Sequence, residues 1–214
     1  MRRLRPGVAA VHDTVAPYRA DWERENAAAL DGSGPLWLVL GDSTAQGIGA
    51  SAPQRGYVGQ LRRRLEARDG HPWRVLNVST SGARLRDVVA DQLPRFDALR
   101  GPAALVTCAA GANDVAWPRR MGRVRDDLRR VVERLPAGAV LATIPKGLDR
   151  RRTAVLNEDI WALAPPAGLV VADVWSHTGP PWARKVAVDH FHPNERGYED
   201  WTAAFAVALR LDGA

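Results

Sequence analysis

The feature that most constrains the fold is a series of short apolar runs separated by amphipathic segments. The runs are LWLVL at 36–40, WRVLNV at 73–78, ALVTCAA at 104–110, AVLATI at 139–144 and GLVVADV at 168–174. Each is apolar almost throughout, which is typical of a parallel strand covered by helices on both faces. The sequence therefore predicts five buried parallel strands.

Segments with helical periodicity alternate with these runs. They lie near 55–68, 84–93, 119–135, 152–164 and 195–210. Strands that alternate with helices imply right-handed crossover connections. We therefore expect an α/β fold, with a doubly wound parallel sheet between layers of helices.

Residues 1–34 come before the first predicted strand. We expect a helix around 8–29, ended by the turn-rich DGSGP at 31–35. The chain has 214 residues, enough to bury about 70% of its unfolded surface in one core. We interpret residues 1–34 as a helical extension packed on the domain, and residues 35–214 as a single domain.

The net charge of +6 comes mostly from arginine and raises the question of an acidic partner. In LRRRLEAR at 61–68 and VRDDLRRVVERL at 124–135, however, arginines fall between apolar positions with acids among them. Solvated helix faces explain this pattern. No zinc-finger spacing or RNA-binding aromatic signature accompanies the charge, so we expect no nucleic-acid partner.

The N-terminal sequence MRRLRPGVAAVHDTV begins with a basic region, but its apolar stretch at 8–11 is shorter than that of an export signal. No segment approaches the roughly 20 apolar residues that span a bilayer. Cys108 is the only cysteine, which excludes an internal disulfide. We therefore expect a cytoplasmic protein without a membrane span, and the sequence predicts no oligomeric state.

Polar residues and glycines follow four of the predicted strands. The first strand is followed by residues 41–43, the second by 79–82, the third by 111–114 and the fifth, beyond a loop, by 189–193. In an open parallel sheet, ligands bind outside the carboxyl ends of the strands. These four segments should therefore meet at one edge of the sheet.

The residue types in these segments match the requirements of acyl transfer. Ser43 can act as the nucleophile, His192 as the base, and Asp189 as the group that orients the base. The backbone N–H of Gly82 and the side-chain amide of Asn113 can stabilise an oxyanion. Alone, each residue has an ordinary explanation as a turn, cap or surface residue. Their recurrence at successive strand ends favours a catalytic site.

Four segments resemble the conserved blocks of the SGNH hydrolases, the GDSL-type esterases and lipases. They are GDSTAQGIGAS around Ser43, NVSTSG ending in Gly82, GAND containing Asn113, and DHFHPNERGY containing Asp189 and His192. They occur in the family's order between residues 40 and 198. Two positions depart from the family pattern, because Ser79 and Arg84 stand where it often has a glycine and a small hydroxyl residue.

The resemblance implies a flavodoxin-like, five-stranded α/β/α sandwich. It also implies a triad of Ser43, Asp189 and His192, with an oxyanion hole formed by the N–H groups of Ser43 and Gly82 and the side chain of Asn113. The implied activity is hydrolysis of small-molecule acyl esters through an acyl-enzyme, with no cofactor and no metal. Esterase, thioesterase and deacetylase activities remain alternatives.

Further residues compete for roles or extend the predicted site. His190 is adjacent to Asp189, but the Asp-x-x-His spacing and the restriction that Pro193 places on His192 favour His192 as the base. Asn194 is expected to cap the final helix. Apolar walls for an acyl group are expected from two tryptophans, Trp117 and Trp182.

Four other functional interpretations remain open. The segment Gly41-x-Ser43-x-Ala45 approximates the nucleophile elbow of α/β-hydrolases, although that fold places its serine further along a longer chain. Asp189, His190 and His192, with Asp173 or His177, could imitate a metal site. Lys146 and the Arg150–Arg152 cluster could instead form a non-catalytic anion-binding module. Cys108 as a nucleophile has the least support, because it lies inside an apolar run.

Overall fold

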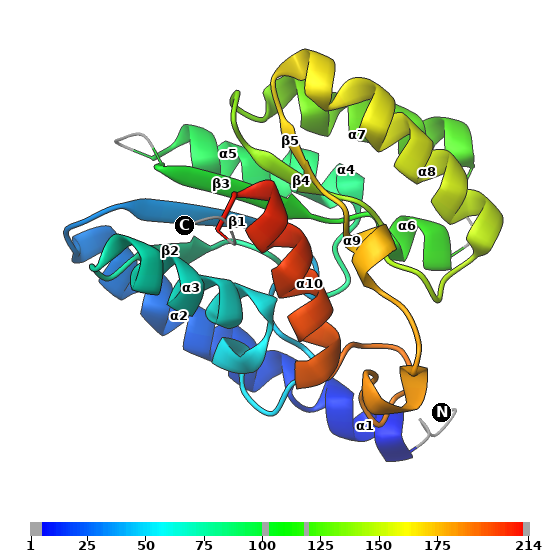
Figure 1. Cartoon of the computed structure of the whole chain (residues 1–214), viewed down its shortest axis with the longest axis horizontal. Coiled ribbons are helices and arrows are strands. Elements are labelled where there is room, and N and C mark those ends of the chain that lie inside the picture. The colour runs from blue at the N-terminus through cyan, green and yellow to red at the C-terminus, as the bar shows by residue number, and fades with distance from the viewer. Residues whose placement is uncertain (1–5, 100–102, 118–119, 212–214) are drawn as a thin grey trace.

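The computed structural model describes residues 6–99, 103–117 and 120–211, and it contains a central sheet of five parallel strands (Figure 1). The strands are β1 (Leu36–Gly41), β2 (Arg74–Asn77), β3 (Leu105–Ala109), β4 (Val140–Ala142) and β5 (Val170–Ala172). Their spatial order is β2-β1-β3-β4-β5, and all four pairings are parallel. This order is that of flavodoxin-like folds, so the predicted fold class is confirmed.

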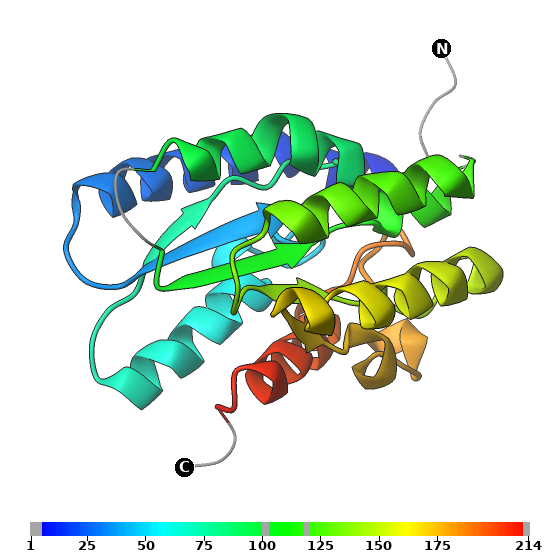
Figure 2. The same ribbon diagram turned by 90° about the horizontal axis from the view of Figure 1, so that it is seen from above.

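Helices cover both faces of the sheet. On one face lie α3 (Tyr57–Asp69) and α10 (Glu195–Ala208), drawn in cyan and red in Figure 2. On the other face lie α4 (Leu85–Asp87), the π-helical segment η2 (Val88–Gln92), α5 (Leu93–Asp97), α7 (Met121–Arg134) and α8 (Arg150–Leu163). Each layer buries one apolar cluster against the strands, which is why the strands are apolar on both faces.

Several short elements connect these layers. They are η1 (Pro53–Arg55), α6 (Ala112–Ala116), η3 (Pro165–Ala167), α9 (Val174–His177) and η4 (Trp182–Arg184). No helix within the three described ranges is both long enough and apolar enough to cross a membrane. The predicted helix at 119–135 corresponds to α7, and its first predicted residue lies outside the described residues.

The segment predicted as one helix at 84–93 continues to Asp97 and contains a π turn. Pro94 has no N–H, so it cannot donate to the carbonyl of Ala90 as a regular helix would require. The N–H of Leu93 instead donates to Val88 O, five residues earlier. The extra residue in this turn directs Gln92 into the core, where it is buried.

The N-terminal segment forms two helices, α1 (Pro6–His12) and α2 (Val15–Asp31), where the sequence suggested one. Pro17 explains the break, because it cannot donate to the carbonyl of Asp13 and its ring crowds that carbonyl. Thr14 Oγ1 donates to Val11 O at 2.7 Å and closes the turn between the helices.

Helix α2 covers the open edge of strand β2. Asn26 behaves like a neighbouring strand, because its Oδ1 accepts from the Asn77 N–H at 2.7 Å and its amide donates to Asn77 O at 2.8 Å. A covered edge cannot pair with another chain. Helix α2 therefore closes the β2 edge of the sheet, next to strand β1, which the Ser43 segment follows.

Candidate active site

The segment after β1 turns sharply and brings Ser43 to the carboxyl edge of the sheet. Asp42 Oδ1 accepts hydrogen bonds from the Thr44 N–H at 2.9 Å and the Thr44 hydroxyl at 2.8 Å, which fixes the turn. Burial raises the pKa of Asp42 above its ordinary value, and the bonds from Thr44 oppose this. Asp42 is thus a structural part of the turn, and the neighbouring Ser43, which is buried, has its Oγ next to the ring of His192.

Ser43, His192 and Asp189 form one continuous hydrogen-bonded chain. His192 Nε2 lies 3.0 Å from Ser43 Oγ, although the two residues are 149 positions apart in the sequence. His192 Nδ1 lies 2.6 Å from Asp189 Oδ2. A carboxylate can only accept, so Nδ1 carries the proton and Nε2 is left to accept from the Ser43 hydroxyl. The structure therefore brings these three predicted residues together.

Both oxygens of the Asp189 carboxylate are engaged. Oδ2 accepts from the His192 ring, while Oδ1 accepts from the backbone N–H groups of Phe191 at 3.0 Å and His192 at 3.1 Å. Burial alone would raise the pKa of Asp189, but these bonds outweigh it and hold that pKa below its ordinary value. The carboxylate is thus ionised and fixed in orientation.

His190, the competing histidine, is placed differently from His192. It is exposed and its backbone has a φ of 57°, which turns the chain between Asp189 and His192. Its N–H donates to Ala187 O at 3.0 Å. Within the described part of the chain, its ring makes no hydrogen bond to Asp189. The geometry favours His192 for contact with Ser43.

The predicted oxyanion donors lie on the loops beside Ser43. Gly82 is exposed and has a φ of +80°, and no atom lies within 4 Å of the position that its Cβ would occupy, so the space on that side of its backbone is open. Asn113, in α6, donates from Nδ2 to Ala83 O at 3.0 Å. The same nitrogen is 3.5 Å from Asp42 Oδ2, at the outer limit of a hydrogen bond. The second N–H of the Asn113 amide therefore makes only a weak hydrogen bond, to the aspartate that precedes Ser43.

Two buried glutamine side chains, which were not predicted from the sequence, connect the segments of the site by hydrogen bonds. Gln92 binds both backbone groups of Gly41, accepting from its N–H and donating to its carbonyl, each at 2.8 Å. Gln46 donates to Ser79 O at 3.0 Å and joins the serine loop to the loop of Gly82. The only sequence signal for Gln92 is its place two residues before Pro94.

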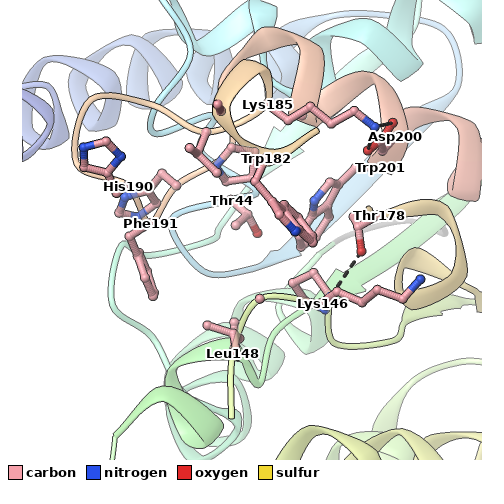
Figure 3. Close-up of a pocket in the computed structure, with 18 residues that line it drawn as sticks. Thr44, Lys146, Leu148, Thr178, Trp182, Lys185, His190, Phe191, Asp200 and Trp201 are labelled. Carbon is pink, nitrogen blue, oxygen red and sulfur yellow. Dashed lines mark hydrogen bonds and ion pairs between the residues drawn. The ribbon is translucent and has the colours of Figure 1, made fainter. Parts of the chain in front are cut away.

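A cavity of about 520 Å³ opens beside His192 and Thr44 (Figure 3). Its walls include Trp182, which is 39% exposed, and the buried Trp201. Trp117, by contrast, is 59% exposed and does not line this cavity. Of the two tryptophans predicted to contact an acyl group, the structure thus places one beside His192.

The basic side chains predicted for an anion site, Lys146 and the Arg150–Arg152 cluster, do not lie together. Arg152 donates to Asp114 O at 2.7 Å and to Trp117 O at 3.3 Å, which ties α8 to α6. Arg150 and Arg151 are exposed at the start of α8, whereas Lys146 lines the cavity. The arginine cluster and Lys146 therefore do not converge on one ligand position.

The residues considered for a metal site are also separated into two groups. Asp173 caps α9 by accepting from the Ser176 N–H, and the ring of His177 lies 2.8 Å from Asp173 O. Among the described residues, no three His, Cys, Asp or Glu side chains are grouped so as to hold a metal ion.

Cys108, the other candidate nucleophile, is buried within β3, and burial raises the pKa of its thiol to about 12.

The parallel sheet, with Ser43, His192 and Asp189 in contact at its carboxyl edge, has the arrangement that the resemblance to the SGNH hydrolases implied. Residues 39–199 match the GDSL-like Lipase/Acylhydrolase family. The chain belongs to this family, and it is therefore a carboxylic ester hydrolase. The predicted family resemblance is confirmed.

Solved structures with the same fold include TesA, at 23% identity and a TM-score of 0.69, covering 82% of this chain and 98% of that one. The lipase Lip_vut3 from a goat rumen metagenome has 16% identity and a TM-score of 0.67, covering 82% and 97%. The acetylxylan esterase Axe2 from Geobacillus stearothermophilus has 23% identity and a TM-score of 0.65, covering 83% and 95%. No curated protein sequence matches the chain.

Proposed function

We propose that the protein hydrolyses small-molecule acyl esters through a Ser43 acyl-enzyme, with His192 as general base and Asp189 as the residue that orients it. The observation that carries this proposal is the unbroken chain of contacts, 3.0 Å from Ser43 Oγ to His192 Nε2 and 2.6 Å from His192 Nδ1 to Asp189 Oδ2. Both distances lie within the range needed for proton transfer and for tautomer control.

In the first half of the reaction, Ser43 Oγ attacks the ester carbonyl while His192 Nε2 takes the serine proton. The carbonyl oxygen becomes an oxyanion, which the N–H groups of Ser43 and Gly82 and the Asn113 amide stabilise. The tetrahedral intermediate then expels the alcohol, which receives its proton from His192. The products are the free alcohol and an ester on Ser43.

In the second half, water attacks the Ser43 ester while His192 Nε2 takes a proton from the water. The intermediate collapses, Ser43 Oγ regains the proton, and the carboxylic acid leaves. Asp189 remains ionised throughout and stabilises the imidazolium that forms in both halves. Its lowered pKa suits this role, because the carboxylate stays charged well below neutral pH.

We also propose that the acyl group of the substrate occupies the cavity beside His192. Besides Trp182 and Trp201, its wall contains apolar residues from two segments, namely Pro145, Leu148, Val186 and Phe191. A concave, mostly apolar wall of this size is the ordinary form of a small-molecule site. The related Lip_vut3 and Axe2 are described as a lipase and an acetylxylan esterase, so esters of different size occur within this fold.

Trp182→Ala is expected to reduce kcat/KM about tenfold or more for butyryl and longer acyl esters, with little effect on acetyl esters. The substitution removes apolar contact that only a longer acyl chain would make. Trp117→Ala is the matched control, because Trp117 lies away from the cavity. Equal chain-length profiles for wild type and Trp182→Ala would remove this assignment.

The ester hydrolase proposal is tested by labelling with a serine-reactive phosphonate, in parallel with an ester turnover assay. Wild type is expected to take up one phosphonate on Ser43 and lose activity, whereas Ser43→Ala is expected to show neither labelling nor turnover. Addition of a chelator should change neither result. Turnover that survives in Ser43→Ala, or that chelation abolishes, would favour the metal-dependent alternative.

A further inference from the structure

Helix α1 lies directly on the loop that carries Asp189 and His192. A Cβ atom placed on Gly7 would be 2.1 Å from Val188 O and 3.6 Å from the backbone nitrogen of Asp189. Cβ atoms do not approach carbonyl oxygens so closely, so only glycine at this position lets α1 reach the loop. Helix α1 lies before residues 39–199, which match the family.

A small apolar cluster joins α1 and α2 to two catalytic loops, the loop that follows Ser43 and the loop that carries Asp189 and His192. Val11, Tyr18 and Ile48 are buried in it, and Val15 and Ala187 pack against them. Ile48 belongs to the loop that follows Ser43, while Ala187 belongs to the loop that carries His192. The N-terminal helices therefore contact both segments that must meet for the Ser43–His192 bond to form.

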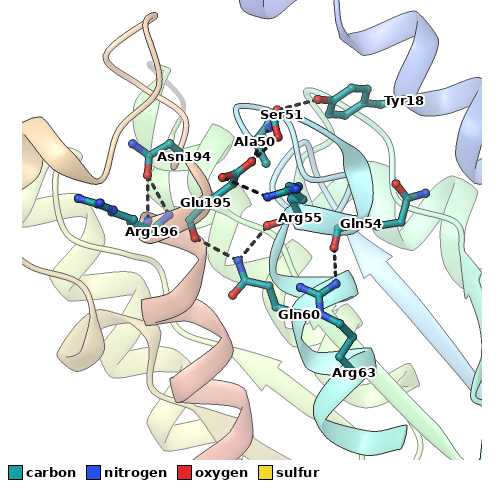
Figure 4. A network of polar contacts seen from close by, with 11 residues as sticks. Tyr18, Ala50, Ser51, Gln54, Arg55, Gln60, Arg63, Asn194, Glu195 and Arg196 are labelled. Carbon is teal, nitrogen blue, oxygen red and sulfur yellow. Dashed lines mark hydrogen bonds and ion pairs between the residues drawn. The ribbon is translucent and has the colours of Figure 1, made fainter.

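The two catalytic loops also contact each other at this place. A Cβ on Gly49 would be 2.4 Å from Pro193 O and 2.8 Å from His192 Cβ, so the backbones of the two loops touch. Tyr18 supports the serine loop from α2, because its hydroxyl donates to Ala50 O at 2.6 Å (Figure 4).

From the other side, Glu195 at the start of α10 holds the end of the serine loop. Its carboxylate accepts from the backbone N–H of Ser51 at 3.3 Å and from the Ser51 hydroxyl (Figure 4). Asn194 caps α10 by accepting from the N–H groups of Arg196 and Gly197. The start of α10 is thus anchored immediately after His192, whereas α1 contacts the other arm of the loop, at Val188 and the backbone nitrogen of Asp189.

We propose that α1 is a positioning element that holds the 186–193 loop so that Asp189 and His192 stay aligned on Ser43. This inference rests on the proposed function of that triad. Helix α1 contributes no residue to the 520 Å³ cavity, but the loop that it contacts supplies Val186 and Phe191 to the cavity wall. Displacing α1 should therefore lower kcat through His192 and also change KM. Misplacement of a catalytic group by about 1 Å is enough to lower a rate by roughly 100-fold.

The test compares Gly7→Ala with Gly122→Ala. Both glycines are the second residue of a helix, but the position of a Gly122 Cβ has no atom within 4 Å. Gly7→Ala is expected to lower kcat roughly 10- to 100-fold through His192, and to change KM as well because the 186–193 loop lines the cavity. Gly122→Ala should stay within about twofold of wild type, because alanine fits that helix without a clash.

A proton NMR measurement gives a second readout that does not depend on turnover. The Nδ1–H of His192, bonded to Asp189, is expected to give a far-downfield resonance in wild type and Gly122→Ala, and to lose it in Gly7→Ala. Circular dichroism and thermal unfolding establish that each variant is folded. Val11→Ala, with the exposed Val207→Ala as control, tests the same contact without a clash.

Equal kcat and an unchanged resonance in folded Gly7→Ala would overturn the positioning role, as would a lower unfolding temperature with unchanged kcat. If Gly7→Ala does not fold, the same comparison of Val11→Ala with Val207→Ala decides. The wild type could show the downfield resonance but no ester turnover, while Gly7→Ala loses the resonance. That result would refute the ester hydrolase proposal and support the positioning role. The two proposals therefore fail separately.

Discussion

His192→Ala is expected to lower kcat for ester hydrolysis by about a millionfold while leaving the protein folded. The substitution removes the proton acceptor that lies 3.0 Å from Ser43 Oγ, and loss of the base from a serine triad costs a factor of this size. Single-turnover measurement of acyl-enzyme formation with an activated ester checks this expectation, because it isolates the step in which Ser43 attacks.

His190→Ala is the control for this experiment. The two histidines are two residues apart, and only the ring of His192 contacts both Ser43 and Asp189 among the described residues. We expect His190→Ala to keep kcat within about tenfold of wild type, with any change in KM reflecting its place at the cavity. A larger kcat loss in His190→Ala than in His192→Ala would reverse the assignment.

Asp189→Asn is expected to lower kcat by about four orders of magnitude, which is the effect of a wrong imidazole tautomer. The backbone N–H groups of Phe191 and His192 both donate to Oδ1, so an asparagine must place its oxygen there. Its NH₂ group then faces His192 Nδ1. Nδ1 must accept, Nε2 carries the proton, and the ring can no longer take the proton of Ser43.

The measurement for Asp189→Asn is kcat at neutral pH, together with a thermal unfolding curve. Asparagine has nearly the shape of aspartate, so the variant should fold, and the loss should appear in kcat with KM little changed. A folded Asp189→Asn variant within tenfold of wild-type kcat would show that Asp189 does not set the tautomer.

The strands and the site could be predicted from the sequence for the same physical reason. Parallel strands covered on both faces are apolar throughout, so each strand ends where polar residues begin. Ser43 and Asn113 lie just past such ends, and a parallel sheet brings those ends to one edge. His192 follows the last strand after a connection that contains α9 and η4. This arrangement predicts that the segments after the strands meet at one edge, whereas the flavodoxin-like fold was implied by the family resemblance.

Features that depend on tertiary contacts could not be predicted in this way. Pro94 indicates a distortion of the helix near Gln92, but the partner of Gln92 could not be predicted, because its bond with Gly41 joins residues 51 positions apart. The contact of Gly7 with Val188 is likewise a meeting of distant segments, and a glycine in an N-terminal helix gives no sign of it. Trp117 and Trp182 have similar sequence surroundings, and only the fold separates them.

The most direct test of the account is a crystal structure of the protein after reaction with a serine-reactive phosphonate. Phosphorus is expected to be bonded to Ser43 Oγ, with the phosphoryl oxygen within hydrogen-bond distance of the N–H groups of Ser43 and Gly82 and of Asn113 Nδ2. His192 Nε2 should face the remaining oxygen. Phosphorus on any other residue, or a phosphoryl oxygen directed away from Gly82 and Asn113, would contradict the account.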